Sequence, residues 1–210
     1  LEPGASGPAL AQLAQRLERP RAVLVQSAHW ESSELLVGSA TAPETWHDFG
    51  GFPPKLYQQQ YPAAGDPQLA IEVSRRLLGD GLENRLDGQR PRDHGAWVPL
   101  SLLYPAADIP VLQISLPTQR GAAFQQRVGR ALAGLRGEGV LLIGSGSITH
   151  NLGQLDWHAG AHSVAPWAQT FRDWMVERLQ AGDETALLNY REQAPFAVRS
   201  HPTEEHLLPL

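Results

Sequence analysis

Residues 139–152 read Gly-Val-Leu-Leu-Ile-Gly-Ser-Gly-Ser-Ile-Thr-His-Asn-Leu, an apolar run that breaks into small residues and delivers His150 near its end. This pattern predicts a buried β-strand that carries an imidazole to a cleft. A second apolar run, 22–26, is followed in the same way by His29. Two strands that each end near a histidine indicate one metal site or acid/base site.

Strands alternate with amphipathic helices along the rest of the chain. The predicted segments are a helix with Leu10, Leu13 and Leu17 on one face, strands over 22–26 and 34–40, a helix from Asp66-Pro67 to Gly79, a helix over 96–103, a strand over 109–116, a helical face of Phe124, Val128, Leu132 and Leu135, a strand from Val140, and a helix over about 166–180 with Trp167, Phe171, Trp174 and Leu179 inward. The alternation predicts a single α/β domain over residues 1–210, with a mostly parallel or mixed central sheet flanked by helices. Ligands of such sheets bind beyond the carboxyl ends of the strands, so the metal site is expected there.

Composition narrows the function classes. The net charge of -5 disfavours nucleic-acid and membrane partners and favours a small-molecule substrate. The chain has no Cys, so any metal must bind to His, carboxylate or water. No apolar run approaches the ~20 residues that span a bilayer and no signal peptide is visible, so a cytoplasmic protein is expected.

The eight histidines differ in the strength of their signal, because none lies in a compact ligand motif. His150 is the strongest candidate, since the residues at 144–147 suit close approach of the backbone to a ligand better than they suit a core. His29 and His94 are equally consistent with structural and functional roles. We expect His47 to be a packed loop histidine, at most one of His201 and His206 to reach the site, and His158 and His162 to lie outside it.

A serine hydrolase is a further interpretation, because Ser145 and Ser147 lie close to His150 in the sequence. The segment Gly144-Ser145-Gly146 lacks the full spacing of a nucleophile elbow, and no Asp is placed to complete a triad. The serine hydrolase is therefore disfavoured.

Five ordered blocks together resemble one known family. The blocks are Ser27-Ala28-His29-Trp30-Glu31, His47-Asp48-Phe49-Gly50-Gly51-Phe52-Pro53, Asp93-His94-Gly95-Ala96-Trp97, Gly144-Ser145-Gly146-Ser147-Ile148-Thr149-His150-Asn151-Leu152 and His201-Pro202-Thr203-Glu204-Glu205-His206. They are similar to the DOPA 4,5-dioxygenase family, a branch of the class III extradiol ring-cleaving dioxygenases related to the catalytic subunit of protocatechuate 4,5-dioxygenase. The resemblance spans nearly the whole chain.

The resemblance implies an oxidoreductase with a mononuclear non-haem Fe(II) site, which also takes Zn(II) in some relatives. It matches His29 and His206, rather than His201, to metal ligands. It matches His150 to the acid/base beside the metal, with a third-ligand role as an alternative, and His94 to a second catalytic histidine.

The implied reaction joins a catechol, either DOPA-like or protocatechuate-like, with O2 and opens the ring beside the two hydroxyls to give a muconic semialdehyde. Trp30, Phe52 and Trp97 are candidates for stacking on the substrate ring, although core packing is the commoner role of such residues. A monomer or small homo-oligomer is expected.

One family block has no counterpart here. Relatives begin with a strand that ends in His-Gly-Ser-Pro, whose His is a ligand, and nothing before Leu10 resembles it. We therefore expect that the chain lacks this N-terminal strand and a C-terminal segment, that the strand would lie beside 22–26, and that metal binding without it is weak.

Two alternatives remain at this stage. The first is a non-catalytic metal-binding or interaction protein of the same fold, of the Memo-like type, against which His150 and His94 argue. The second is a zinc-dependent hydrolase, for which Glu31, on the same side of the predicted strand as His29, is the nearest candidate base.

Overall fold

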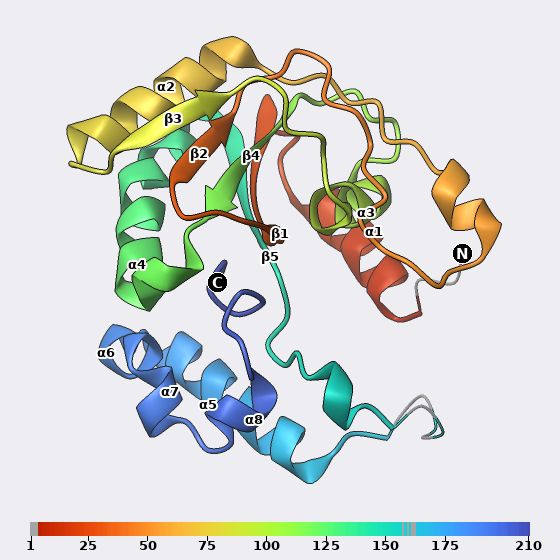
Figure 1. Ribbon diagram of the computed structural model, residues 1–210, viewed down its shortest axis with the longest axis vertical. Coiled ribbons are helices and arrows are strands. Elements are labelled where there is room, and N and C mark those ends of the chain that lie inside the picture. Colours follow the sequence, from red (N-terminus) through yellow and green to blue (C-terminus); the bar gives the residue numbers. More distant parts are fainter. Residues whose placement is uncertain (1–3, 157, 159, 161–162) are drawn as a thin grey trace.

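A five-stranded mixed sheet forms the centre of the computed structural model, which describes residues 4–156, 158, 160 and 163–210 (Figure 1). The strands are β1 (Ala22–Glu31), β2 (Leu35–Gly38), β3 (Asn84–Asp87), β4 (Val111–Leu116) and β5 (Val140–Ser145), in the spatial order β3-β2-β4-β1-β5. β1 is parallel to both β4 and β5, and β2 is antiparallel to β4. The predicted α/β fold with a mixed sheet is confirmed.

β1 has hydrogen-bonded neighbours on both edges. The prediction that an additional N-terminal strand would lie beside 22–26 is therefore wrong. Val23 pairs with Val111 of β4 and with Leu141 of β5, so the backbone of 22–26 is already occupied on either side. An additional strand has no free edge there. It would have to pair elsewhere than beside 22–26.

Helices cover both faces of the sheet and its carboxyl end (Figure 1). They are α1 (Ser6–Arg16), α2 (Pro67–Gly79), α3 (His94–Leu103), α4 (Gly121–Leu132), α5 (Pro166–Ala181), α6 (Glu184–Leu188), α7 (Tyr190–Gln193) and α8 (Ala197–Ser200), with 3-10 turns at Pro54–Gln58, Thr118–Arg120, Ala133–Glu138 and Leu152–Gln154. Leu24 of β1 packs in the core formed with α2 and α4, and Val23 and Val25 pack in the core formed with α3. Burial on both faces explains why the strand is continuously apolar.

The helix predicted from Leu10, Leu13 and Leu17 forms, but its buried face differs from the prediction. Leu13 is 43% exposed, whereas Leu10 and Ala14 pack against the core on the α3 side. The four-residue spacing of Leu10 and Ala14 follows one face of an α-helix, so the contact with the sheet runs along that row.

A third cluster of apolar residues joins α5, α7 and α8 to the C-terminal segment 201–210. Phe171 and Met175 of α5 are buried in it, while Trp167 and Trp174 are half-buried. The prediction that Leu179 points inward is wrong, because its side chain is 40% exposed and lines an open groove.

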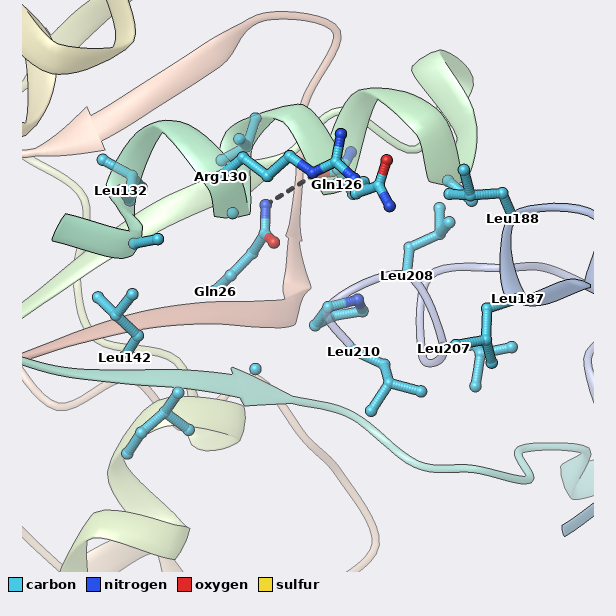
Figure 2. A pocket seen from close by; sticks show the side chains of 18 of the residues that line it. Gln26, Gln126, Arg130, Leu132, Leu142, Leu187, Leu188, Leu207, Leu208 and Leu210 are labelled. Atoms are coloured by element: carbon cyan, nitrogen blue, oxygen red, sulfur yellow. Dashed lines mark hydrogen bonds between the residues drawn. The ribbon is translucent and has the colours of Figure 1, made fainter. Parts of the chain in front are cut away.

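That groove has a volume of about 690 Å³ and lies between α4, β5, α6 and the C-terminal segment (Figure 2). Leu132, Leu142, Leu187 and Leu208 are among the leucines that line it, and Gln26 at its floor donates to Gln125 at 3.0 Å. Among the described residues, its lining contains no histidine. This groove is therefore separate from the histidine cluster described below.

Several element boundaries also differ from the predictions. The strand over 22–26 continues to Glu31, the strands expected over 34–40 and 109–116 are shorter, and β3 was not predicted. The helix expected over 96–103 begins at His94, because the Asp93 side chain caps it and accepts a hydrogen bond from Ala96 N at 3.3 Å. His94 therefore lies in the first turn of α3. None of the described helices combines the length and the apolar character needed to cross a membrane.

Candidate active site

Four histidines from distant parts of the chain meet at the carboxyl end of the sheet. The ring centroids of His29 and His94 are 3.9 Å apart, and those of His29 and His206 are 5.0 Å apart. His150 stacks on His206 at 3.4 Å. His29 and His206, which the family resemblance matches to metal ligands, lie near opposite ends of the sequence and are neighbours in the structure.

Gly95 allows α3 to approach β1 closely. A Cβ at this position would lie 2.3 Å from Ser27 Oγ and 2.9 Å from His29 Cδ2. Any larger residue would push the helix away from the strand. The Asp-His-Gly sequence at 93–95 thus caps the helix, supplies one histidine and makes room for another.

Gly144 and Gly146 bring the C-terminal segment to the end of β5. A Cβ on Gly144 would lie 2.0 Å from Pro209 O, and one on Gly146 would lie 2.1 Å from His206 O. Ser147 N donates to His206 O at 2.7 Å. The small residues therefore admit protein backbone, and the expectation that they admit a ligand is corrected.

Two carboxylates that the sequence analysis did not select hydrogen-bond to this cluster. Asp48 Oδ1 accepts from His94 N at 2.9 Å and lies 2.9 Å from His94 Nδ1. Glu205 Oε1 lies 2.9 Å from His206 Nδ1 and 4.0 Å from His150 Nδ1. Both carboxylates adjoin a histidine in the quoted blocks, and this adjacency was the available signal.

Together these residues form two groups, each with two histidines and one carboxylate. Within each group the candidate ligand atoms all lie within 4.8 Å of one another. The groups are His29, Asp48 and His94, and His150, Glu205 and His206. His29 of the first group and His206 of the second are neighbours, with ring centroids 5.0 Å apart, so the two groups adjoin. Imidazoles and carboxylates are ligands that suit non-haem Fe(II), so the residues present fit that metal.

Burial keeps key imidazoles neutral. It lowers the pKa of His29 to about 4, and the neighbouring charges of His94 and His206 add to this effect. Burial, followed by the charge of His206, also lowers the pKa of His150. Neutral imidazole is the form that binds a metal and the form that accepts a proton.

The carboxylates behave in the opposite way, because hydrogen bonds outweigh burial. Burial would raise the pKa of Asp48, but the hydrogen bonds from His94 lower it overall. In Glu205, burial is likewise outweighed by hydrogen bonds from His206 and Thr203, and the pKa is lowered. Both groups are therefore anions that hold adjacent histidines in place.

Aromatic side chains of the loop at 46–61 lie beside His94. Phe49, which the sequence analysis did not select, has its ring 5.5 Å from His94, and Phe52 lies 5.5 Å beyond Phe49 and is 55% exposed. Trp97 is buried and its Nε1 donates to Trp46 O at 2.8 Å.

Trp30, the third aromatic candidate for substrate binding, is 3% exposed. The guanidinium of Arg90 lies 5.1 Å from the centroid of its ring. The ring of Trp30 is thus buried against Arg90, which is the core-packing role and not the substrate-stacking role.

The remaining histidines have structural surroundings. His201 is buried and its Nε2 lies 2.7 Å from Ile148 O, so of the pair 201 and 206 only His206 joins the cluster. His47 Nε2 lies 2.9 Å from Gln59 O, which suits the predicted packed loop histidine. His158 is exposed, and His162 lies outside the described residues.

Two residues on which the disfavoured interpretations depended also have other partners. Ser145 Oγ donates to Gly95 O, so its hydroxyl is not directed at a histidine base. Glu31 is exposed and accepts from Thr118 Oγ1 at 3.0 Å. The observed contacts therefore support neither a serine nucleophile nor a Glu31 base.

Comparison with known proteins agrees with this geometry. A 4,5-DOPA dioxygenase extradiol from Beta vulgaris is 42% identical over 194 residues, which cover 92% of this chain and 72% of that protein. Its Escherichia coli K12 counterpart is 40% identical over 203 residues, covering 95% and 73%. The crystal structure of an uncharacterized E. coli K12 protein superposes with a TM-score of 0.82 at 34% identity, covering 100% of this chain and 80% of that one.

Residues 7–210 match the family described as the catalytic LigB subunit of aromatic ring-opening dioxygenase. This match includes all four clustered histidines and both carboxylates. The chain therefore belongs to the LigB family of extradiol, aromatic ring-opening dioxygenases.

Proposed function

We propose that this metal-dependent extradiol dioxygenase acts on a DOPA-like catechol and uses Fe(II). The cluster of four histidines carries the proposal. Relatives named 4,5-DOPA dioxygenase extradiol, at 39–42% identity in three plants, support a DOPA-like over a protocatechuate-like substrate. A cytoplasmic location and a monomeric or small homo-oligomeric state stay predictions from the sequence.

The metal would be held by His29 and His206, with His150 as the third candidate ligand. Their imidazoles suit Fe(II), which supplies adjacent open positions for the catechol oxygens and O2 and can change its oxidation state. Zn(II) suits the same imidazoles but has no redox chemistry, so a zinc-loaded protein would not cleave rings.

His150 and His94 would move the protons. Ring cleavage needs a base that removes a proton from the catechol and an acid that later returns one. The low pKa of His150 leaves it neutral and able to accept the catechol proton. His94 would assist from the other side of His29, because its Nδ1 is bound to Asp48 and its Nε2 is left for a reacting group.

The substrate ring would be bound by aromatic side chains. Phe52 is the candidate with the most exposed surface, whereas Trp97 and Trp30 are each 3% exposed and would support neighbouring protein groups rather than touch the ring. Phe49 joins this proposal because its ring lies between Phe52 and His94.

The two alternative functions are not favoured. A Memo-like interaction protein needs neither His94 nor His150, yet both lie in the cluster with carboxylate partners. A zinc-dependent hydrolase would need Glu31 near His29, whereas Glu31 bonds to Thr118 at the surface. The named relatives are dioxygenases.

Anaerobic loading with Fe(II), followed by addition of L-DOPA and air, tests the proposal. The expected result is a yellow ring-fission product with one O2 consumed per substrate. His29→Ala should abolish both the product and metal retention. Failure of the Fe(II)-loaded protein to consume O2 with any catechol would overturn the proposed function.

A further inference from the structure

We infer that Arg90 and Asp93 are positioning residues that fix the backbone of His29 through a partly buried ion pair. The inference rests on the proposed function, because it concerns the histidine assigned to the metal. Neither residue is proposed as a metal ligand. Both act on the main chain that carries His29.

The first observation is a gap in the sheet around His29. β1 pairs with β4 up to Gln26 and again only at Glu31, and its register shifts between these two residues. The pairing with β5 ends at Ser27. The peptide groups of His29 therefore lie where, in the described sheet, regular ladder pairing is interrupted, and they need other partners.

The second observation is that side chains supply those partners. His29 N donates to Ser27 Oγ at 3.2 Å, and Ser27 Oγ in turn donates to Asp93 Oδ1 at 2.7 Å. His29 O accepts from Arg90 at 3.0 Å, and the same guanidinium nitrogen donates to Asp93 Oδ2 at 3.3 Å. Both peptide groups of His29 are thus connected to one carboxylate.

The third observation is that this network cannot move easily. Asp93 is completely buried, and it also accepts from Gln113 Nε2 at 2.7 Å and from Ala96 N. The guanidinium of Arg90 lies 5.1 Å from the Trp30 ring and 4.7 Å from the Trp46 ring. A planar guanidinium packs between two indoles and still donates in its plane, which an ammonium group cannot do.

Asp93 also fixes the other half of the site, because its side chain caps α3 immediately before His94. One buried carboxylate therefore sets the position of His29 on β1 and of His94 on α3. Residues that orient metal ligands in this way commonly change metal affinity by about 10-fold to 100-fold when replaced.

Co(II) titration followed by visible absorption tests the inference, with Arg90→Lys as the main variant. We expect Arg90→Lys to bind Co(II) about tenfold or more weakly than the wild type, with altered Co(II) absorption bands, because His29 is no longer held in place. Arg92→Lys is the matched control. Arg92 is a buried arginine close to Arg90 in the sequence, but it donates to Tyr61 O, Ala63 O and Val111 O. This control should lose thermal stability and keep the Co(II) affinity and spectrum.

The outcomes separate this inference from the proposed function. If the wild type binds no Co(II), or if His29→Ala binds it equally well, the proposed metal site fails and the inference fails with it. If the wild type binds Co(II) through His29 but folded Arg90→Lys binds it equally well with the same spectrum, only the positioning role is overturned. Should Arg90→Lys not fold, Ser27→Ala breaks the second connection between Asp93 and the backbone of His29, the one through His29 N, and unchanged Co(II) binding by that variant overturns the inference.

Discussion

Each carboxylate in the cluster determines which ring nitrogen of its histidine faces the site. Because the pKa of Asp48 is lowered, it is an anion and accepts a hydrogen bond from His94 Nδ1, which leaves the lone pair on Nε2. Glu205 has the same relation to His206. The two rings are thereby prepared for binding a metal or a proton without reorientation.

His150→Ala should retain most of the metal and lower ring cleavage by about 10² to 10⁴, the usual range for a lost general acid/base. The expected difference between metal content and turnover follows from the proposed proton-transfer role of His150. Metal analysis and steady-state kinetics on the same preparation make the comparison. Parallel loss of metal and activity would instead identify His150 as a principal ligand. His94→Ala should have a smaller effect than His150→Ala.

Asp48→Asn should lower kcat by about tenfold or more while metal content stays unchanged, because the amide keeps an acceptor for His94 N but does not impose the same ring tautomer. Asp108→Asn is a suitable control, since Asp108 forms a surface ion pair with Arg19. A kcat for Asp48→Asn equal to that of Asp108→Asn would show that the carboxylate does not assist His94.

Sequence patterns identified the histidines better than they identified the carboxylates. His29 and His150 follow apolar runs, so their strands indicated where they would lie. Asp48 and Glu205 lie in irregular segments, and the only signal for either is that it adjoins a histidine in the sequence. Asp48 reaches His94 through a tertiary contact across 46 residues, which its position beside His47 does not indicate.

At the scale of elements, the small residues after β5 determine whether the C-terminal segment can dock. Gly146→Ala should destabilise the protein by about 1–3 kcal/mol, because the added Cβ meets backbone rather than a flexible side chain. It should also weaken metal binding, since His206 is displaced. Urea unfolding and metal titration measure the two effects.

Gly129→Ala is the matched control for this experiment. A Cβ on Gly129 of α4 meets no atom within 4 Å, and alanine is the better helix former, by about 1 kcal/mol. This variant should be slightly more stable and bind metal normally. If Gly146→Ala behaves like Gly129→Ala, the proposed contact between 146 and 206 is unimportant.

Element boundaries were less predictable than element types. β1 extends beyond its apolar run because Ser27 and Asp93 satisfy each other, which permits polar residues in a buried strand. β3 reads Asn-Arg-Leu-Asp and lies at the sheet edge, so it lacks the apolar alternation by which strands are found. These elements form through contacts with neighbouring segments.

For the whole molecule, the metal-free protein should lose stability as pH falls below 6.5. The pKa of His29 is lowered to about 4, and burial also lowers those of His150 and His201, so the unfolded chain binds more protons than the folded one in this range. The contribution of these neutral imidazoles to the free energy of unfolding is present above the unfolded-state pKa near 6.5. It is lost as the pH falls toward the folded-state pKa of His29, about 4.

Urea unfolding at a series of pH values measures this effect. Zn(II) should stabilise the protein at neutral pH, because it binds only the folded arrangement of neutral imidazoles, and the stabilisation should fade on acidification. A free energy of unfolding that stays constant between neutrality and pH 4 would contradict the assignment of neutral, buried imidazoles.

The fold class followed from alternating strands and helices, whereas the order of strands did not. Parallel neighbours such as β1 and β5 are separated by about half of the chain, so their pairing is decided by packing between layers. The groove beside α4 was likewise not predictable, because its wall combines several elements distant in sequence.

Docking of residues 206–209 against Gly144 and Gly146 has a consequence for biosynthesis. The ribosome releases His29 and His94 early and His206 much later, and domains tend to fold in the order in which they are made. Half of the imidazoles therefore emerge long before the others can join them. A nascent chain cannot bind its metal ion with the complete donor set before translation has passed residue 206.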